Sequence, residues 1–484
     1  MMSARPTLWT AADVAAATRG RSTGDWVASG VSIDSRSVEA GDLFIAISGP
    51  NHDGHAYVAD ALANGAAGAV VAKTMDGIDP ARLIVVADTM AALEDLARAA
   101  RDRCAGGIVG VTGSVGKTGT KEMLSRALGA QTGGADAVSA TAGNLNNHWG
   151  LPLSLARMPS DADFGALEMG MNHPGEISPL SRMARPHVAV ITTVADTHSE
   201  YFDGLEQIAD AKAEIFDGLT EGGTAVLNAD IAMFPRLAEA ARRAGVAKIV
   251  TFGAGEGADC RLLKYSTQGA EGIVSALING RTLDVTLGQP GRHLALNALA
   301  VLAAVDALGA DVEKAAESLA EMKGLKGRGE RHQIALADGT FEMIDEAYNA
   351  SPASMAAAIA VLTGSQPQSG GRRIAVLGDM LELGAKADAL HAALVAPLAE
   401  GGIDKVYCAG THMAALWRAL PADMRGHHAE TSEDLLDAAV NAVRAGDVVM
   451  VKGSLGSRMQ PIVDALLQLG PASVDAMPRV VNGG

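Results

Sequence analysis

The chain has 484 residues and a net charge of −17; 48% of its residues are hydrophobic and only 3% are aromatic. This length predicts two to four domains with a large buried core. The acidic balance excludes nonspecific nucleic-acid binding, which needs a basic surface, but it allows an anionic substrate in a locally basic pocket. Three widely spaced cysteines and an N-terminus without an apolar signal-peptide core predict a cytoplasmic protein with reduced thiols.

The first block, 1–104, alternates short apolar runs with turn residues and closes with a predicted helix at 89–104. Its turn-rich segment "DSRSVEAGDLF" contains Ser35 and Arg36. These side chains could hold an anionic or nucleotide ligand, and turn formation explains them almost as well. Both interpretations stay open from the residues alone.

A glycine-rich turn follows the apolar strand "GIVGVTG" and precedes the helical segment "TKEMLSRALGA". This arrangement aims backbone N–H groups and the positive end of a helix at one point, which favours phosphate. The standard signature G-x-x-x-x-G-K-[ST] places its first glycine at position 111, where this chain has valine. We still predict a phosphate loop, with Lys117 on the β- and γ-phosphates and Thr118 as a ligand of Mg²⁺. The predicted nucleotide contacts are Gly113, Ser114, Val115, Gly116, Lys117, Thr118 and Gly119.

Two polar groups follow the phosphate loop at the ends of predicted elements. Asn144, Asn146 and Asn147 stand between a predicted strand and a predicted helix, where they could bind sugar or peptide groups or simply form a turn. Glu168 ends the apolar run "DFGALE". A carboxylate there could bind Mg²⁺ or orient water, and a surface or helix-capping acid is equally consistent with the pattern.

His198 and Lys212 have ordinary explanations when the spacing is considered alone. His198 follows the apolar run "HVAVITTV", and a histidine in a loop more often has a structural role. Lys212 lies on a predicted helix, where a lysine usually extends into solvent. The apolar stretch 294–310 is interrupted by Asn297 and Asp306, so it predicts a buried helix and no membrane span.

The last block begins near the polar segment 321–331. Three of its apolar strands end in glycine, at "RRIAVLG", "DKVYCAG" and "GDVVMVKG". Such strands present a ligand edge at their carboxyl ends. Asp345 lies at a predicted strand end, Asn349 lies in the loop that follows, and Lys452 is a candidate for binding an anionic group.

Alternating strand and helix patterns predict an α/β fold with mostly parallel sheets. We expect three domains, with bounds at 1–104, 105–322 and 323–484.

The motif "TGSVGKT", 112–118, matches the phosphate-loop spelling T-G-[ST]-x-G-K-[ST] of the Mur ligases. The chain resembles this superfamily over nearly its whole length, through "NLNN", "LEMGMNHPGEI", "ADAKAEIF", "YNASPASM" and "GDMLELG". Mur ligases are ATP-dependent amide-bond ligases. The resemblance implies an N-terminal UDP-substrate domain, a central P-loop ATPase domain and a C-terminal Rossmann-like domain.

Several motifs resemble most closely the branch that joins D-alanyl-D-alanine to UDP-N-acetylmuramoyl-tripeptide in peptidoglycan synthesis. These are "TKEM", "NLNN", "YNASPASM" and "GDMLELG", and the D-N-P-R motif of the preceding ligase is absent from the sequence. The resemblance implies that ATP converts the tripeptide carboxylate into an acyl phosphate, which the dipeptide amine attacks. It also implies a protein that works as a monomer, with domain closure on ATP binding.

The resemblance also implies roles for matching residues. Thr118 and Glu168 would hold one Mg²⁺, and His198 a second. Lys212 matches the lysine that is carbamylated in most of the superfamily, where the carbamate acts as a carboxylate-like ligand. The implied catalytic residues are Lys117, His198 and Lys212.

Further roles concern the nucleotide and the substrates. Asn297 would face adenine, and Arg328 and Asp345 would close on the nucleotide from the third domain. The implied substrate contacts are Ser35, Arg36, Asn144, Asn146, Asn147, Asn349 and Lys452. Two departures from the family pattern, Glu346 and Ser351, weaken the assignment of Asn349.

Two alternatives remain from the sequence. One is another Mur-type amide ligase, either diaminopimelate-adding or similar to folylpolyglutamate synthase. The other is a P-loop regulatory switch, which would hydrolyse nucleotide without an amine acceptor.

Overall fold

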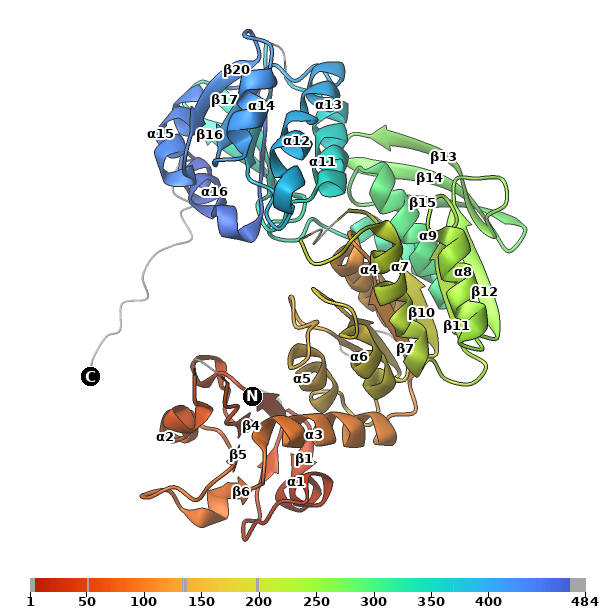
Figure 1. Cartoon of the computed structure of the whole chain (residues 1–484), viewed down its shortest axis with the longest axis vertical. Helices are drawn as coiled ribbons and strands as arrows, with labels where there is room; N and C mark the ends of the chain where they lie inside the picture. The colour runs from red at the N-terminus through yellow and green to blue at the C-terminus, as the bar shows by residue number, and fades with distance from the viewer. Residues whose placement is uncertain are drawn as a thin grey trace.

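The computed structural model describes residues 5–49, 52–132, 134, 137–196, 200–368 and 370–470. These residues form three lobes in chain order, arranged as an arc in which the first and third lobes stand on opposite sides of an open space (Figure 1). Each lobe is built on its own main sheet flanked by helices, so the predicted three-domain α/β fold is confirmed.

The first lobe contains a parallel sheet in the order β3-β4-β5-β6 and a small antiparallel pair, β1 and β2. Its strands are β1 (Trp9–Thr10), β2 (Val27–Ala28), β3 (Gly30–Ser32), β4 (Asp42–Ile45), β5 (Gly68–Val71) and β6 (Leu83–Val85). Its helices are α1 (Ala11–Thr18), α2 (Val58–Ala63) and α3 (Thr89–Arg103). Helix α3 confirms the helix predicted at 89–104 and begins where Asp88 accepts hydrogen bonds from the next backbone N–H groups.

The central lobe contains a nine-stranded sheet in the order β15-β14-β13-β12-β11-β10-β7-β9-β8. Its strands are β7 (Gly107–Thr112), β8 (Val138–Ala140), β9 (Phe164–Glu168), β10 (Val188–Ile191), β11 (Thr224–Asn228), β12 (Lys248–Gly253), β13 (Cys260–Gln268), β14 (Glu271–Ile278) and β15 (Arg281–Leu287). The pairs from β8 to β13 are parallel, whereas β13, β14 and β15 pair antiparallel. The carboxyl ends of β7, β9, β10 and β11 therefore meet at one edge.

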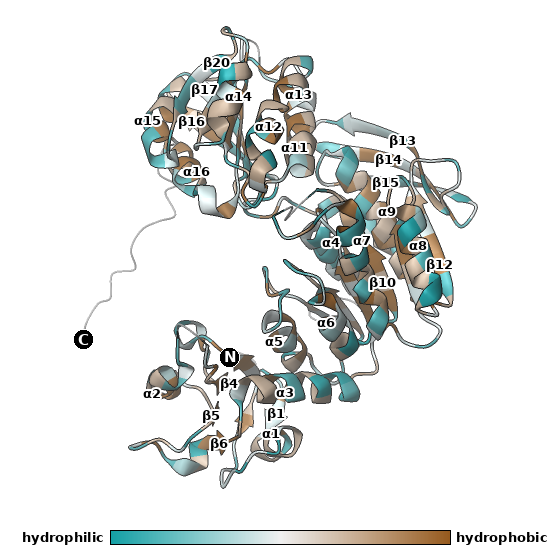
Figure 2. Ribbon diagram, in the orientation of Figure 1, coloured by the Kyte–Doolittle hydropathy of each residue, from teal (hydrophilic) through white to brown (hydrophobic). Residues whose placement is uncertain are grey.

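Helices cover the central sheet. They are α4 (Lys117–Thr132), α5 (Gly150–Ala156), α6 (Ile177–Ala184), α7 (Leu205–Ala213), α8 (Phe234–Arg243), α9 (Arg292–Ala307) and α10 (Val312–Ser318). Hydrophobic residues concentrate on the strands, and hydrophilic residues mark the outer surface of α8 (Figure 2).

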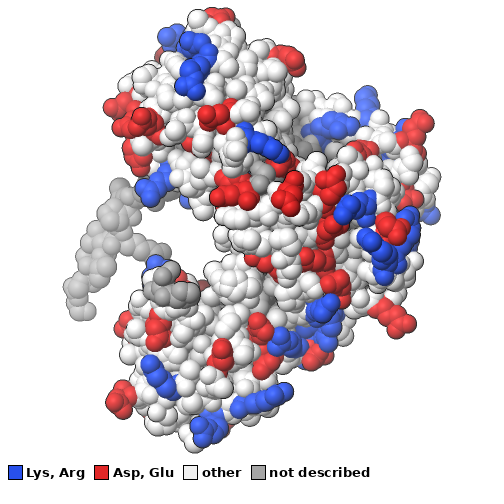
Figure 3. Space-filling model, in the orientation of Figure 1, with Lys and Arg blue, Asp and Glu red and all other residues white. Residues whose placement is uncertain are grey.

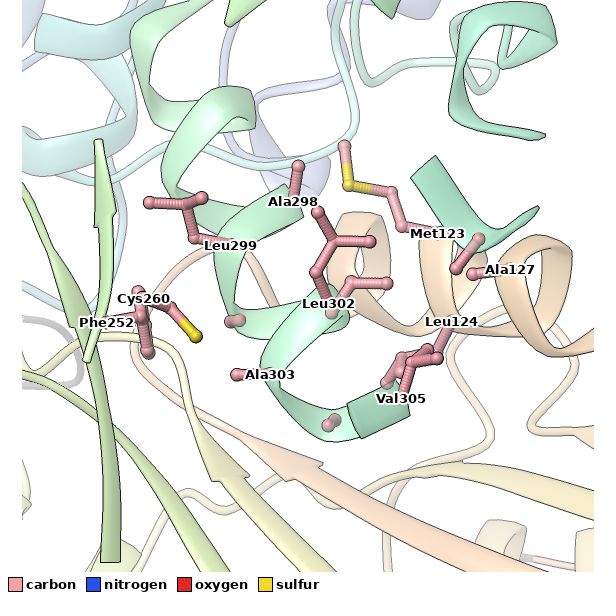
Figure 4. Close-up of a cluster of buried hydrophobic side chains, with 14 of the residues drawn as sticks. Met123, Leu124, Ala127, Phe252, Cys260, Ala298, Leu299, Leu302, Ala303 and Val305 are labelled. Atoms are coloured by element: carbon pink, nitrogen blue, oxygen red, sulfur yellow. The ribbon is translucent and has the colours of Figure 1, made fainter. Parts of the chain in front are cut away.

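Helix α9 is the apolar segment that the sequence predicts as a buried helix. Its alanine-rich surface packs between α4 and the sheet, where Leu302 and Val305 lie beside Leu124 of α4, and Leu299 lies on the side of Phe252 (Figure 4). Small side chains allow this helix to lie close to its neighbours at native packing density. None of the described helices is long and apolar enough to cross a membrane.

The third lobe contains a six-stranded sheet in the order β16-β17-β21-β18-β19-β20, in which β16 is antiparallel to β17 and the other pairs are parallel. Its strands are β16 (Glu330–Leu336), β17 (Gly339–Glu346), β18 (Arg373–Gly378), β19 (Lys405–Ala409), β20 (Arg425–Ala429) and β21 (Val448–Lys452). Its helices are α11 (Pro352–Gly364), α12 (Ala387–Ala392), α13 (Val395–Glu400), α14 (Met413–Ala419), α15 (Ser432–Ala442) and α16 (Gln460–Leu467).

The first lobe is joined to the central lobe through α5. Trp9 Nε1 donates to Ala156 O at 2.8 Å, and Arg157 Nε donates to Val31 O at 2.7 Å. Leu153 and Ala156 also belong to the hydrophobic core of the first lobe. The two lobes therefore share a core, although they have separate sheets.

Lysine and arginine side chains are interspersed with acidic ones on the visible face of all three lobes (Figure 3). On this face, basic and acidic side chains are mixed and neither kind forms a continuous surface.

Candidate active site

The phosphate loop connects β7 to α4 through residues that require glycine. Gly113 has φ +152°, and a Cβ there would overlap Thr192 Oγ1. Gly116 has φ +87°, and a Cβ there would lie 3.0 Å from Asn297 Oδ1. Both positions lie in the region of backbone conformation that favours glycine. The two glycines of the motif therefore each have a local steric reason.

Hydrogen bonds hold this loop against the segment that follows β10. Ser114 N donates to Thr193 O at 2.9 Å, and Ser114 Oγ donates to Ala195 O at 2.9 Å. Thr192 Oγ1 donates to Val115 O at 2.7 Å. These hydrogen bonds hold the loop in one arrangement, which favours preorganised phosphate recognition.

Lys117 is the first residue of α4, and its Nζ donates to Gly113 O at 2.7 Å. Burial lowers the pKa of the Lys117 ammonium from its ordinary value; the negative charge of Glu168 opposes this shift, and Arg328 reinforces it. Thr118 is buried one residue further along, at the positive end of the same helix. The predicted phosphate and metal ligands of the loop thus lie where an anion is stabilised.

Glu168 ends β9 and is only 1% exposed. Its Oε1 accepts a hydrogen bond from Asn146 Nδ2 at 2.7 Å, while its Oε2 is buried without a hydrogen-bond partner among the described residues. A buried carboxylate oxygen without a partner is costly unless a cation or another donor satisfies it. The site therefore fits a bound cation.

The donor set at this position fits Mg²⁺ rather than a softer metal. A carboxylate oxygen and a threonine hydroxyl are hard oxygen ligands, and Mg²⁺ normally takes its remaining ligands from phosphates and water. No cluster of three or more His, Cys, Asp or Glu side chains suited to a metal occurs within the part of the chain that the structure describes. Thr118 and Glu168 are the described residues that could hold Mg²⁺.

Lys212 lies on the last turn of α7 and is 2% exposed, which corrects the expectation from spacing that it extends into solvent. Burial, with a smaller contribution from the charge of Lys117, lowers the pKa of its amine well below the ordinary value. A larger fraction of such a buried amine is neutral, and therefore nucleophilic, than of an exposed lysine at the same pH. His198, which the resemblance implies as a ligand of a second Mg²⁺, lies outside the described residues.

The three asparagines of the loop before α5 have different partners. Asn147 Oδ1 accepts from Gly150 N at 2.9 Å and so caps the start of α5. Asn146 Nδ2 donates a hydrogen bond to Glu168 Oε1. Asn144 is exposed, and its backbone carbonyl accepts from Asn146 N. Each of them lines the cavity described below.

The third lobe contributes basic groups. The Arg328 guanidinium lies over the Tyr348 ring at 4.3 Å from its centroid. Lys452 is buried, and its Nζ donates to Glu346 Oε2 at 3.1 Å and to Asn349 O at 2.9 Å. These contacts place the side chains at the carboxyl ends of β17 and β21, which are neighbouring parallel strands.

Asp345 has a different environment from the one that a nucleotide contact suggests. Burial raises the pKa of Asp345, although hydrogen bonds from Ala347 N and Gly327 N, both at 3.0 Å, act against this. One of its oxygens thus supports the backbone next to Arg328, and the other supports the backbone of Ala347. Its predicted contact with the nucleotide stays a prediction.

A cavity of about 560 Å³ lies between the central and third lobes. It brings together most of the sequence-predicted site residues: Ser114, Val115, Gly116, Lys117, Thr118, Gly119, Asn144, Asn146, Asn147, Glu168, Asn297, Arg328, Asn349 and Lys452. Gly113, Lys212 and Asp345 are not among the residues that line it. Loops from two sheets therefore converge on one space.

Ser35 and Arg36 lie in the first lobe and do not line this cavity. The Arg36 side chain is 87% exposed and forms two hydrogen bonds, at 2.9 and 2.7 Å, with the Asp34 carboxylate. Ser35 O accepts from Asn64 Nδ2 at 3.1 Å. A separate substrate contact by these residues stays a prediction.

Sequence reasoning missed several residues that line the cavity, among them Thr192, Asn228, His293 and Tyr348. Thr192 and Asn228 lie just after or at the ends of β10 and β11, so the strand-end rule could have found them. His293 lies at the start of α9, where no such rule applies. Burial lowers the pKa of the His293 imidazole.

Three family models match the chain. They are described as Mur ligase family, catalytic domain, over residues 27–101; Mur ligase middle domain, over residues 111–305; and Mur ligase, glutamate ligase domain, over residues 327–455.

Known proteins are similar to the chain over nearly its whole length. The UDP-N-acetylmuramoyl-tripeptide–D-alanyl-D-alanine ligase of Bacillus subtilis is 35% identical, covering 91% of this chain and 93% of its own. The crystal structure of MurF from Acinetobacter baumannii has a TM-score of 0.81 at 30% identity, covering 95% and 99%. That of MurF ligase from Thermotoga maritima in complex with ADP has a TM-score of 0.75 at 29% identity, covering 91% and 97%.

Proposed function

The chain belongs to the Mur ligase family, and from this membership we propose that it joins D-alanyl-D-alanine to UDP-N-acetylmuramoyl-tripeptide in peptidoglycan synthesis. It is an ATP-dependent amide-bond ligase. The structural observation that supports this function best is the cavity between the central and third lobes. It combines a phosphate loop, a buried carboxylate with an unpaired oxygen, and basic groups from another domain.

The chemistry requires activation of a carboxylate, because oxide is a poor leaving group and the carboxylate resists attack by an amine. Transfer of the γ-phosphoryl group of ATP to the terminal carboxylate of the tripeptide gives an acyl phosphate and ADP. The amine of D-alanyl-D-alanine attacks the acyl carbon, and the tetrahedral intermediate expels phosphate as the amide forms. The site must therefore stabilise charge on the transferring phosphoryl oxygens.

We assign that task to the phosphate loop. Lys117 and the backbone N–H groups at the start of α4 bind the β- and γ-phosphates. Thr118 and Glu168 would hold Mg²⁺, which would supply positive charge to the phosphoryl oxygens. A second Mg²⁺ at His198 remains part of the proposal.

We also propose that Lys212 carries a carbamate. Its supporting observation is the lowered pKa of a buried amine, since only a neutral amine reacts with CO₂. The reaction forms an N–C bond, releases a proton and gives a carboxylate-like group in place of a cation. Such a group would supply oxygen atoms beside the Mg²⁺ site.

The third lobe would complete the site. Arg328 and Asp345 act on the nucleotide side, Asn349 and Lys452 on the acceptor side, and Asn297 borders the adenine. Ser35 and Arg36 contribute from the first lobe to binding of the UDP group. Domain bounds at 1–104, 105–322 and 323–484, a monomeric state and a cytoplasmic location belong to the same proposal.

The decisive experiment measures phosphate release from ATP with UDP-N-acetylmuramoyl-tripeptide fixed and the amine acceptor varied. We expect release with D-alanyl-D-alanine and little with diaminopimelate or glutamate. Release driven by either amino acid would favour another Mur-type ligase. Equal release without any acceptor would favour a nucleotide-hydrolysing switch.

A further inference from the structure

Asn146 holds one oxygen of Glu168 and leaves the other available. Its Nδ2 donates to Glu168 Oε1 at 2.7 Å, in a position where the carboxylate is almost fully buried. Glu168 Oε2 has no hydrogen-bond partner among the described residues. Among the described residues, the hydrogen bond from Asn146 is the one that the Glu168 carboxylate accepts, and rotation of the carboxylate would break it. The orientation of Oε2 therefore depends on Asn146.

Asn146 is itself held in place by the backbone after β9. Gly170 N donates to Asn146 O at 2.8 Å, and Asn146 N donates to Asn144 O at 2.7 Å. A Cβ added at Gly170 would lie 2.7 Å from Asn146 Oδ1. The Asn146 amide therefore occupies the space that a side chain at position 170 would need. Glu168 is fixed from its other end, because its backbone N donates to Thr141 Oγ1 at 3.0 Å.

We propose that Asn146 is a positioning residue that aims Glu168 Oε2 at the metal ion, and that it does not contact the substrate. This inference rests on the proposed Mg²⁺–ATP site. A neutral amide can orient a carboxylate without neutralising it, whereas a lysine or arginine would compete with the cation. Partners that orient ligating carboxylates typically affect metal affinity by about 10- to 100-fold when they are removed.

The test uses Mn²⁺ as the probe and follows its binding to the full chain by electron paramagnetic resonance in the presence of a non-hydrolysable ATP analogue. For Asn146→Ala we expect Mn²⁺ binding to weaken about 10-fold. Asn146→Asp should weaken it as well, because its carboxylate cannot donate to Glu168 and like charges would then lie together. The KM values for tripeptide and dipeptide at saturating metal should stay near those of the parent.

Two further variants separate this role from general damage. Gly170→Ala should displace the Asn146 amide and weaken Mn²⁺ binding without removing any cavity side chain. Asn172→Ala removes another asparagine from the same cavity wall, one whose backbone N–H bonds to Glu176, and should leave Mn²⁺ affinity unchanged. Thermal melts of all variants show which of them are folded. If Asn146→Ala does not fold, the Mn²⁺ affinity of Gly170→Ala tests the proposal instead.

The results that overturn the inference differ from those that overturn the proposed function. Parent-like Mn²⁺ affinity in folded Asn146→Ala, with a raised KM for the tripeptide, would make Asn146 a substrate contact. Parent-like affinity in Glu168→Gln would remove Glu168 from the metal site, and the positioning role with it. If Glu168→Gln loses Mn²⁺ and Asn146→Ala does not, the metal site stands and only the positioning role fails.

Discussion

Lys117 is held in place by its own loop, because its ammonium group donates to the carbonyl of Gly113. Burial lowers the pKa of the Lys117 ammonium, and the negative charge of Glu168 partly raises it again. If this cation binds the phosphates as proposed, it would need little rearrangement when charge develops on them.

For Lys117→Ala we expect ligation to fall by about 100-fold or more, since loss of one preorganised donor costs about that much. The fold should survive, because the hydrogen bonds that the Lys117 side chain forms with described residues go to carbonyl groups of its own loop. Steady-state kinetics with circular dichroism checks this. Lys264→Ala, at an exposed lysine of β13, serves as the control with unchanged kinetics. Retained turnover in Lys117→Ala would remove the loop from the mechanism.

For Lys212→Ala we expect a severe loss of activity that short-chain carboxylates partly restore. In the parent, ¹³C-labelled CO₂ should give a carbamate resonance that the variant lacks. Carbamate formation releases protons and needs a neutral amine, so this resonance should weaken as the pH falls. The lowered pKa of Lys212 means that the carbamate persists to a lower pH than it would on an exposed lysine. Full activity in the plain variant would contradict the carbamate.

At the scale of elements, Glu214 ties the end of α7 to the start of α6. Its carboxylate accepts from Gly175 N at 2.6 Å and from Ile177 N and Ser178 N at 3.1 Å. Helix α6 has no side-chain cap of its own, so an acid from a segment 36 to 39 residues away satisfies its first N–H groups. The loop after Glu168 is thereby joined to the helix that carries Lys212.

We expect Glu214→Ala to destabilise the chain by about 1–2 kcal/mol, the usual cost of losing a helix cap. Denaturant unfolding measures this. Asp217→Asn is the matched control: Asp217 contacts Ser178 and Arg182 on the same helix but accepts from the Ser178 hydroxyl instead of the backbone. A similar loss of stability in both variants would mean that the cap has no special effect.

Strand ends were the part of the site that the sequence could reveal. The apolar runs before Glu168 and Lys452 made their positions predictable, because carboxyl ends of parallel strands meet at one edge. The positions of Glu214 and His293 could not be predicted, because their neighbours are distant in sequence and neither residue lies at a strand end. The burial of Lys212 also could not be read from helical spacing, because the side of α7 that faces the core depends on tertiary packing.

Most of the fold was also accessible, since short apolar strands and an alanine-rich helix have clear patterns. The antiparallel pairing of β13, β14 and β15 departs from the expected mostly parallel sheets, because pairing direction depends on contacts between distant residues. At Asp345, the strand-end position was predictable, whereas the hydrogen bonds from two backbone N–H groups were not, because they depend on the fold of the neighbouring loops.

At the scale of the whole molecule, the contacts between lobes are unequal. The first lobe shares its core with α5, whereas the hydrogen bonds and ion pairs between the central and third lobes include Gln289 Nε2 to Gly329 O at 2.7 Å and a 3.8 Å ion pair between Lys386 and Asp196. Exposed ion pairs of this length contribute little. Movement of the third lobe is therefore the easier way to close the site.

We expect the radius of gyration to decrease when an ATP analogue and the tripeptide bind together, because ligands from separate lobes must meet around them. Small-angle scattering measures this. Lys117→Ala, with its weakened hold on the phosphates, should contract less under the same conditions. A parent profile unchanged by both ligands would contradict closure.

The core shared through α5 couples the thermal unfolding of the first lobe to that of the central lobe. Leu153 and Ala156 are packed in the first lobe but belong to a helix of the central lobe, so neither lobe can melt without exposing apolar surface of the other. Heat should therefore divide the chain into two cooperative units instead of three, with the first 320 or so residues in one and the third lobe in the other.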